Sequence, residues 1–219
     1  MDALDPLHFC IAMGPVAVYC LLLGLINFRR RPFVTSGTRD ALALGIAISG
    51  FAIAGPMELF LPTQAAHRFG PLVWVLMIAF YGLCLTLIVL LMRPRLVIYN
   101  STVDQLRPIL AGVVAELDKD SRWAGDSLSL PSLGIQLHIE SFSMMRNTQL
   151  VASNRQQSYN GWRQLEISLT GALRDTQSGP NPYAIVLLSV SVLLTVAMAA
   201  WGMVQHEELA RALRDMFQP

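Results

Sequence analysis

The stretch Pro71–Tyr99 reads PLVWVLMIAFYGLCLTLIVLLMRPRLVIY and joins two different kinds of sequence. Its first portion, Leu72–Met92, has no charged residue and is long enough, at about 1.5 Å per residue, to cross the roughly 30 Å hydrocarbon core of a bilayer. Arg93-Pro94-Arg95 ends this span, and the next residues, Leu96–Tyr99, have the composition of a β-strand. We therefore predict a membrane region before this point and a water-soluble region after it.

The overall composition points to an integral membrane protein. Hydrophobic residues make up 53% of the chain, charged residues only 14%, and the mean hydropathy is +0.47. A net charge of +1 gives no reason to expect binding to nucleic acid, which requires a clustered basic surface. Cys10, Cys20 and Cys84 all lie in apolar stretches, where their spacing suits neither a disulfide framework nor a metal site.

Four apolar stretches predict four transmembrane helices, at about Pro6–Phe28, Ala41–Leu61, Leu72–Met92 and Tyr183–Val204. The expected domains are a membrane region (1–95), a soluble domain (96–179), a fourth helix within 180–204 and an amphipathic tail (205–219). Small residues four apart in the second helix, such as Ala41 and Gly45, predict close contact with a neighbouring helix. In the fourth helix, the hydroxyls of Ser191 and Thr195 are expected to bridge to the second. The tail is either an interfacial or partner-binding helix or a solvated continuation of the fourth helix.

The distribution of arginine predicts the orientation. Arg29–Arg31 and Arg39 lie in the first loop and Arg93 and Arg95 follow the third span, whereas the second loop holds only Arg68. The positive-inside rule then places the first loop and residues 96–179 in the cytoplasm and both termini outside. Arg29–Arg31, together with Arg93 and Arg95, form a basic rim that either attracts anionic lipid or only sets the topology.

The N-terminal residues and the preference for arginine over lysine predict where the protein resides. Residues 1–5 are acidic and lack the basic start of a secretory signal, so we expect the first span to be retained. Lys119 is the only lysine, and such a preference for arginine suggests a GC-rich bacterial genome. The predicted location is therefore the bacterial cytoplasmic (inner) membrane.

Residues 96–179 are predicted to form a small α+β domain with the order β-α-β-β-β-α. A strand at Leu96–Tyr99 is followed by a helix from about Thr102, then by strands of alternating apolar residues, and finally by a helix whose apolar residues recur at helical spacing. The apolar positions of the last helix are Trp162, Leu165, Leu169 and Leu173. The predicted fold class is a bundle of four transmembrane helices plus a two-layer α+β domain, inserted between the third and fourth helices.

Glu58 is the only acidic residue inside a predicted span. An ionisable group in a membrane suggests proton or cation handling, but Glu58 is close enough to the end of its span to pair with His67 or Arg68 at the interface. His8 lies near the same predicted side and completes a candidate cluster with Glu58 and His67. No sequence spacing ties these three residues together, so we predict no metal site and no cofactor.

His138 and Glu140 share one face of a predicted strand, and with Glu166 on the last helix they are the candidates for acid–base chemistry. The alternative is that they only form the solvated side of a sheet. The chain contains no Walker loop, HExxH, paired CxxC or GxGxxG motif after a strand, and no serine in a nucleophile elbow. We therefore predict no catalytic residues, although an enzymatic function stays open.

The expected function is that of a non-enzymatic interaction, scaffolding or regulatory subunit, acting through its cytoplasmic α+β domain. Its expected partners are the lipid bilayer and either another protein or further copies of the same chain. The alternative is a small transport or sensing protein that uses Glu58, and a third hypothesis is a membrane enzyme that uses His138 and Glu140. The sequence does not identify a small-molecule ligand.

Overall fold

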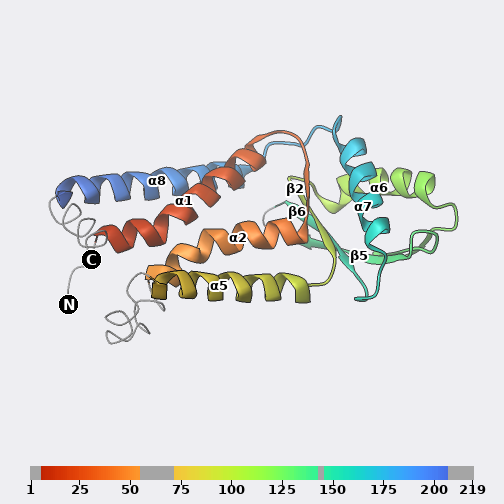
Figure 1. Ribbon diagram of the computed structural model, residues 1–219. Coiled ribbons are helices and arrows are strands. Elements are labelled where there is room, and N and C mark those ends of the chain that lie inside the picture. The colour runs from red at the N-terminus through yellow and green to blue at the C-terminus, as the bar shows by residue number, and fades with distance from the viewer. Residues whose placement is uncertain (1–5, 55–71, 143–145, 207–219) are drawn as a thin grey trace. The chain divides into compact units, whose positions relative to one another are not determined.

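The computed structural model describes residues 6–54, 72–142 and 146–206 (Figure 1). The chain divides into two compact units, which we describe separately. The helical unit contains the described residues of Met1–Leu23, Leu42–Leu90 and Val186–Pro219, and the sheet unit consists of Gly24–Ala41 and Leu91–Ile185. Both classes of structure expected from the sequence, long apolar helices and a mixed α+β region, are therefore present.

Among the described residues, four long helices have most of their length in the helical unit. They are α1 (Pro6–Phe28), α2 (Gly37–Ala52), α5 (Leu72–Leu91) and α8 (Pro182–Val204). Three of them match the predicted spans closely. Helix α2 differs because it begins at Gly37, four residues before the predicted start. The last portion of the predicted second span, from Gly55 onward, lies outside the described residues, as do Glu58 and most of the tail.

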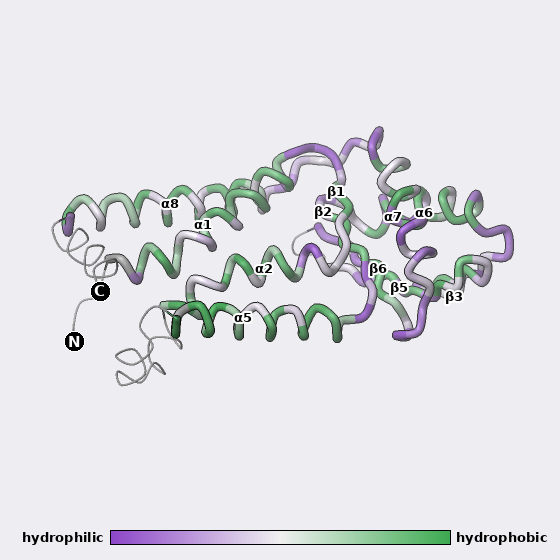
Figure 2. Tube along the Cα trace, viewed as in Figure 1, coloured by the Kyte–Doolittle hydropathy of each residue, from purple (hydrophilic) through white to green (hydrophobic). Residues whose placement is uncertain are grey.

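The helices of this unit are apolar and expose their apolar side chains. Residues His8–Phe28 and Pro182–Val204 are each long and apolar enough to cross a membrane, and only 11% of each apolar window is buried. The core helix of a soluble protein would be mostly buried, so this low value argues against that interpretation. The described apolar stretch of α5, Val75–Leu91, is shorter. Figure 2 shows the same pattern as predominantly hydrophobic colouring along all four helices.

Small residues allow the helices to pack closely. A Cβ atom added to Gly50 of α2 would lie 2.1 Å from the backbone oxygen of Ile11 in α1. On α5, the hydroxyl of Tyr81 donates a hydrogen bond of 2.6 Å to the backbone oxygen of Gly45 in α2. The prediction that α2 is a closely packed helix therefore agrees with these contacts, and in membranes small residues favour such contacts.

The hydroxyl of Ser191 in α8 bonds to a different helix from the one predicted. It donates a hydrogen bond of 2.9 Å to the backbone oxygen of Ala17 in α1. Thr195 donates to the backbone oxygen of Ser191 in its own helix. The expectation that these hydroxyls bridge to the second helix is therefore wrong, because the spacing of residues along α8 does not reveal which helix is its neighbour.

The sheet unit contains one six-stranded antiparallel sheet with the order β1-β2-β6-β5-β4-β3. Its strands are β1 (Phe33–Ser36), β2 (Arg95–Tyr99), β3 (Arg122–Ala124), β4 (Ser127–Leu130), β5 (Ile135–Phe142) and β6 (Asn147–Ala152). Two helices belong to the same unit, α6 (Val103–Leu117) and α7 (Tyr159–Leu173).

Two of the six strands are missing from the predicted order. Strand β3 lies between α6 and β4, and β1 lies between the first two apolar helices. In β1, Phe33 pairs with Tyr99 of β2 and Ser36 pairs with Leu96. The sheet is thus not built from 96–179 alone, which corrects the predicted order β-α-β-β-β-α. Short strands such as these carry too few alternating residues to be recognised by periodicity.

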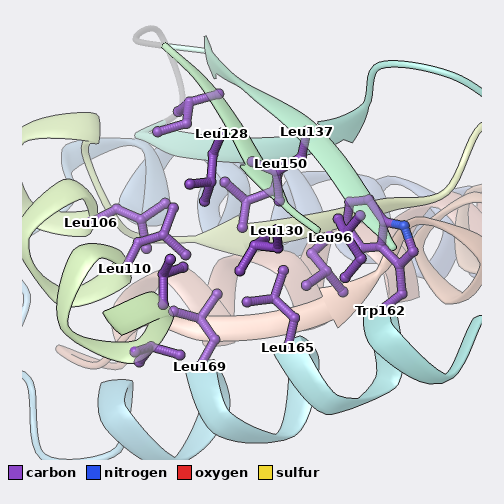
Figure 3. Close-up of a cluster of buried hydrophobic side chains, with 14 of the residues drawn as sticks. Leu96, Leu106, Leu110, Leu128, Leu130, Leu137, Leu150, Trp162, Leu165 and Leu169 are labelled. Atoms are coloured by element: carbon purple, nitrogen blue, oxygen red, sulfur yellow. The ribbon is translucent and has the colours of Figure 1, made fainter. Parts of the chain in front are cut away.

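Helices α6 and α7 cover one face of the sheet and enclose its hydrophobic core (Figure 3). Every second residue of the central strands points into this core, including Leu128, Leu137 and Leu150. From the helices come Leu106, Leu110, Val113 and Val114 of α6 and Trp162, Leu165, Leu169 and Leu173 of α7, and each of these side chains is at most 7% exposed. The predicted two-layer packing of these elements is therefore observed.

A buried carboxylate joins two turns at the end of this core. Asp118, which ends α6, accepts hydrogen bonds from the backbone N–H of Asp120 and from both the backbone N–H and the hydroxyl of Ser132, at 2.8–2.9 Å. Burial by itself raises the pKa of Asp118. The bonds from Ser132, Asp120 and the backbone N–H of Leu133 outweigh that effect, so the pKa lies below its ordinary value.

Replacing Gly50 with alanine tests the contact between α1 and α2. The added Cβ would lie 2.1 Å from a backbone oxygen, so we expect a loss of about 1–3 kcal/mol in the free energy of unfolding. Gly82→Ala on α5 is the matched control, because nothing lies within 4 Å of its added Cβ. The control should be neutral or stabilising by up to about 1 kcal/mol. Unfolding of the detergent-solubilised chain measures both, and equal effects would contradict the contact.

Asp118 should make the sheet unit sensitive to acid. Because its folded pKa is lowered, its stabilising effect is present above the unfolded pKa of about 4 and is lost as the pH falls through the folded value. Asp118→Asn should therefore unfold more easily at pH 7 and show a smaller loss of stability below pH 4 than the original chain. The melting temperature of both chains, measured from pH 7 to pH 2.5, tests this. Parallel pH profiles would contradict the assignment.

Candidate functional site

The face of the sheet opposite α6 and α7 carries a row of polar side chains. The residues of β2, β6 and β5 that do not enter the core lie on this face, because successive side chains of a strand point to opposite sides. Gln149 of β6 pairs with Val97 of β2 on one side and with Glu140 of β5 on the other. These pairings decide which polar side chains of this face are neighbours.

One end of the row is the first turn of α2. The hydroxyl of Tyr99 donates a hydrogen bond to Oδ1 of Asp40, and Oδ2 of Asp40 lies 3.7 Å from Nη2 of Arg95. Nη1 of Arg95 donates a hydrogen bond of 3.4 Å to Oε1 of Gln149. Asp40 is thus connected through Arg95 to the middle of the sheet.

The local sequence explains why Asp40 is held there. Strand β1 ends at Ser36, whose hydroxyl accepts a weak hydrogen bond of 3.4 Å from the N–H of Arg39 in the first turn of α2. Gly37 leaves room for Arg95, whose Cγ would lie 2.1 Å from a Cβ at this position. Arg39 in turn pairs with Glu166 of α7 at 3.2 Å. The first turn of α2 is therefore bound to β2 by Asp40 and to α7 by Arg39.

The other end of the row is the pair His138 and Glu140. Nε2 of His138 lies 2.7 Å from Oε1 of Glu140, so the two side chains share one face, as their spacing on one strand predicts. They are 32% and 47% exposed, against 19% for Asp40 and 26% for Arg95. The row is thus most accessible to a partner at His138 and Glu140.

The geometry of this pair limits its chemistry. Ser127 of β4 pairs directly with His138, yet Glu140 is the only hydrogen-bond partner of the His138 ring among the described side chains. A nucleophile needs a base within hydrogen-bond reach, and this arrangement lacks that bond. Glu166 belongs to α7 on the opposite side of the sheet and pairs with Arg39. The suggestion that Glu166 acts together with His138 and Glu140 is therefore wrong.

The structure brings together only some of the predicted site residues. Glu58 and His67 lie outside the described residues, so their grouping with His8 of α1 stays a prediction. Within residues 6–54, 72–142 and 146–206, no group of three or more His, Cys, Asp or Glu side chains is placed to hold a metal ion. Cys10, Cys20 and Cys84 are free thiols.

Sequence reasoning missed Asp40, Arg95 and Tyr99 as one cluster. Asp40 was distinguished only by its position in the first loop. Arg95 was used only to predict the orientation of the chain in the membrane. Comparisons with protein-family models, with curated proteins and with solved structures find no match to this chain. A function for this protein must therefore be inferred from the geometry of the polar row.

Tyr99→Phe tests the connection between α2 and the sheet. It removes a hydrogen bond to a carboxylate, and we expect the free energy of unfolding to fall by about 1–3 kcal/mol. Tyr159→Phe is the control, because Tyr159 is 77% exposed and its change should stay within about 0.5 kcal/mol. Chemical unfolding in detergent, followed by tryptophan fluorescence, measures both variants. A Tyr99 variant as stable as the control would contradict a structural role for this bond.

Proposed function

We propose that this protein is a non-enzymatic regulatory or scaffolding subunit of the bacterial cytoplasmic membrane. In this proposal, four helices cross the membrane, both termini lie outside and the sheet unit lies in the cytoplasm. A partner protein docks on the polar face of the sheet, at His138 and Glu140. The polar row that joins this pair to the first turn of α2 is the observation on which the proposal depends.

The distribution of charge supports the membrane location in this proposal. Every Asp, Glu, Lys and Arg among the described residues belongs to the sheet unit. Exposed large apolar side chains show the opposite distribution, since most of them lie on α1, α2, α5 and α8. Charged groups are costly inside hydrocarbon, whereas apolar groups are stable there. The helical unit therefore has the surface of a protein surrounded by lipid.

The two faces of the sheet support docking at His138 and Glu140. Helices α6 and α7 cover one face, whereas the other face is exposed over β4 and β5, at Ser127, Gln136 and Glu140. These side chains are polar, and the pair of His138 and Glu140 can bind a charged group of a partner. A contact at Glu140 acts on Gln149, its neighbour across the strands, and through Arg95 on Asp40 in α2. This route gives a docked partner a way to act on a membrane helix.

Site-specific photo-crosslinking tests the docking face. A photoreactive amino acid at Gln136, next to the pair, should give a crosslinked product of defined mass in native cells. The same amino acid at Glu116, an exposed residue of α6, should not. Glu140→Lys should abolish the Gln136 product, whereas Glu116→Lys, which makes the same change in charge, should leave it intact.

Four outcomes of this experiment are decisive. A product that contains a second, different chain supports the partner-protein proposal, and a product of two identical chains replaces it with a homo-oligomer. The absence of a product at Gln136, or equal products at both positions, would overturn docking on this face.

A further inference from the structure

The segment Phe28–Phe33, which joins α1 to β1 within the sheet unit, exposes three arginines between two aromatic rings. Its sequence is Phe-Arg-Arg-Arg-Pro-Phe. Arg29, Arg30 and Arg31 are all exposed, and Phe28 and Phe33 are 65% and 44% exposed. Three positive charges and two apolar rings therefore face outward from one short segment at the end of an apolar helix.

The backbone of this segment is held in place by buried polar groups. The side-chain amide of Asn100 donates a hydrogen bond of 2.7 Å to the backbone oxygen of Arg29, and the N–H of Ser178 donates one of 3.0 Å to that of Arg30. Asn100 is fully buried, with a positive φ of 59°. The ring of Phe33 also contacts that of Tyr99, with centroids 6.4 Å apart. The arginine side chains thus project from a backbone that the sheet unit holds fixed.

These three side chains differ from three other arginines of the sheet unit. Arg39, Arg95 and Arg107 each pair with a carboxylate. Among the described residues, no ion pair or side-chain hydrogen bond involves the guanidinium groups of Arg29–Arg31. A guanidinium binds carboxylate and phosphate well because its N–H groups form a planar fork. Three such forks on a fixed backbone form a surface suited to a ligand with several negative charges.

We propose that Phe28–Phe33 binds the phosphate groups of anionic phospholipids. This inference rests on the proposed function, because it requires α1 to cross a bilayer. The exposed rings of Phe28 and Phe33 favour lipid over free phosphate, since apolar side chains beside basic ones enter the boundary between headgroups and acyl chains. Basic residues beside a transmembrane helix are attracted to anionic headgroups within a Debye length of the surface.

Native mass spectrometry of the purified full chain in detergent micelles tests this proposal, with phosphatidylglycerol as the probe and phosphatidylcholine as the neutral reference. Near an anionic surface, each basic residue contributes roughly a fivefold factor in affinity. R29Q/R30Q/R31Q should therefore bind phosphatidylglycerol about a hundredfold more weakly. R155Q/R163Q/R174Q removes three exposed arginines elsewhere in the sheet unit and should bind within about twofold of the original chain.

Two further variants keep the test decisive. R29K/R30K/R31K retains the charge and should bind more tightly than the glutamine variant. Arg30→Gln alone should lose roughly fivefold, and it decides the question if the triple glutamine variant does not fold. Equal losses in the R29Q/R30Q/R31Q and R155Q/R163Q/R174Q variants, or no loss in either, would overturn the proposal. Displacement of the lipid by millimolar inorganic phosphate would also overturn it, in favour of a phosphate site.

Flotation of the original chain with pure phosphatidylcholine vesicles separates this inference from the proposed function. A chain that does not float with them, or that alkaline carbonate removes from them, is not inserted, and the membrane proposal itself then fails. A chain that inserts into these vesicles but shows no arginine-dependent preference for phosphatidylglycerol contradicts only the lipid site.

Discussion

The antiparallel pairing of β1 with β2 is the contact on which the organisation of the sheet unit depends. Strand β1 lies between α1 and α2 in the chain, and β2 follows α5 after only three residues. Pairing these two strands therefore connects the C-terminal ends of α1 and α5 and the N-terminal end of α2 to adjacent strands of one sheet. The same pairing makes β1 an edge strand of the sheet and places Gly37, directly after it, against Arg95 of β2. Asp40, in the first turn of α2, consequently reaches Tyr99 and Arg95.

Charged side chains are distributed unevenly between the two units. A charged side chain in hydrocarbon needs a partner or access to water, and the helical unit has no charged side chain within its described residues. Its polar groups are instead satisfied locally, as in the bonds from Ser191 to Ala17 and from Tyr81 to Gly45. The sheet unit contains buried polar groups as well, and some of these are paired with one another. Asn181, which precedes α8, donates to the side-chain oxygen of Asn27 at 3.0 Å.

The polar face of the sheet connects an exposed pair to a helix through few intermediates. Glu140 and Gln149 are cross-strand neighbours, Gln149 accepts from Arg95, and Arg95 pairs with Asp40. Each contact is short range, and side-chain exposure falls from 47% at Glu140 to 19% at Asp40. Electrostatic interactions strengthen as water is excluded, so the less exposed pair of Arg95 and Asp40 is screened less by water than the pair of His138 and Glu140.

The sequence by itself determined the local features of this protein. Uncharged stretches of about twenty residues predicted α1, α5 and α8 almost to the residue, and the sequence pattern predicted α6, α7 and the strands β4, β5 and β6. It also placed His138 and Glu140 on one face, since residues two apart in a strand point the same way. Only the tertiary structure decided which segments become neighbours. Four-residue β1 was not recognised, Ser191 contacts α1 and not α2, and Gln149 lies between Arg95 and Glu140 because of the strand order. Periodicity reports how a residue relates to its own helix or strand, whereas pairing between distant segments depends on contacts that sequence spacing does not encode.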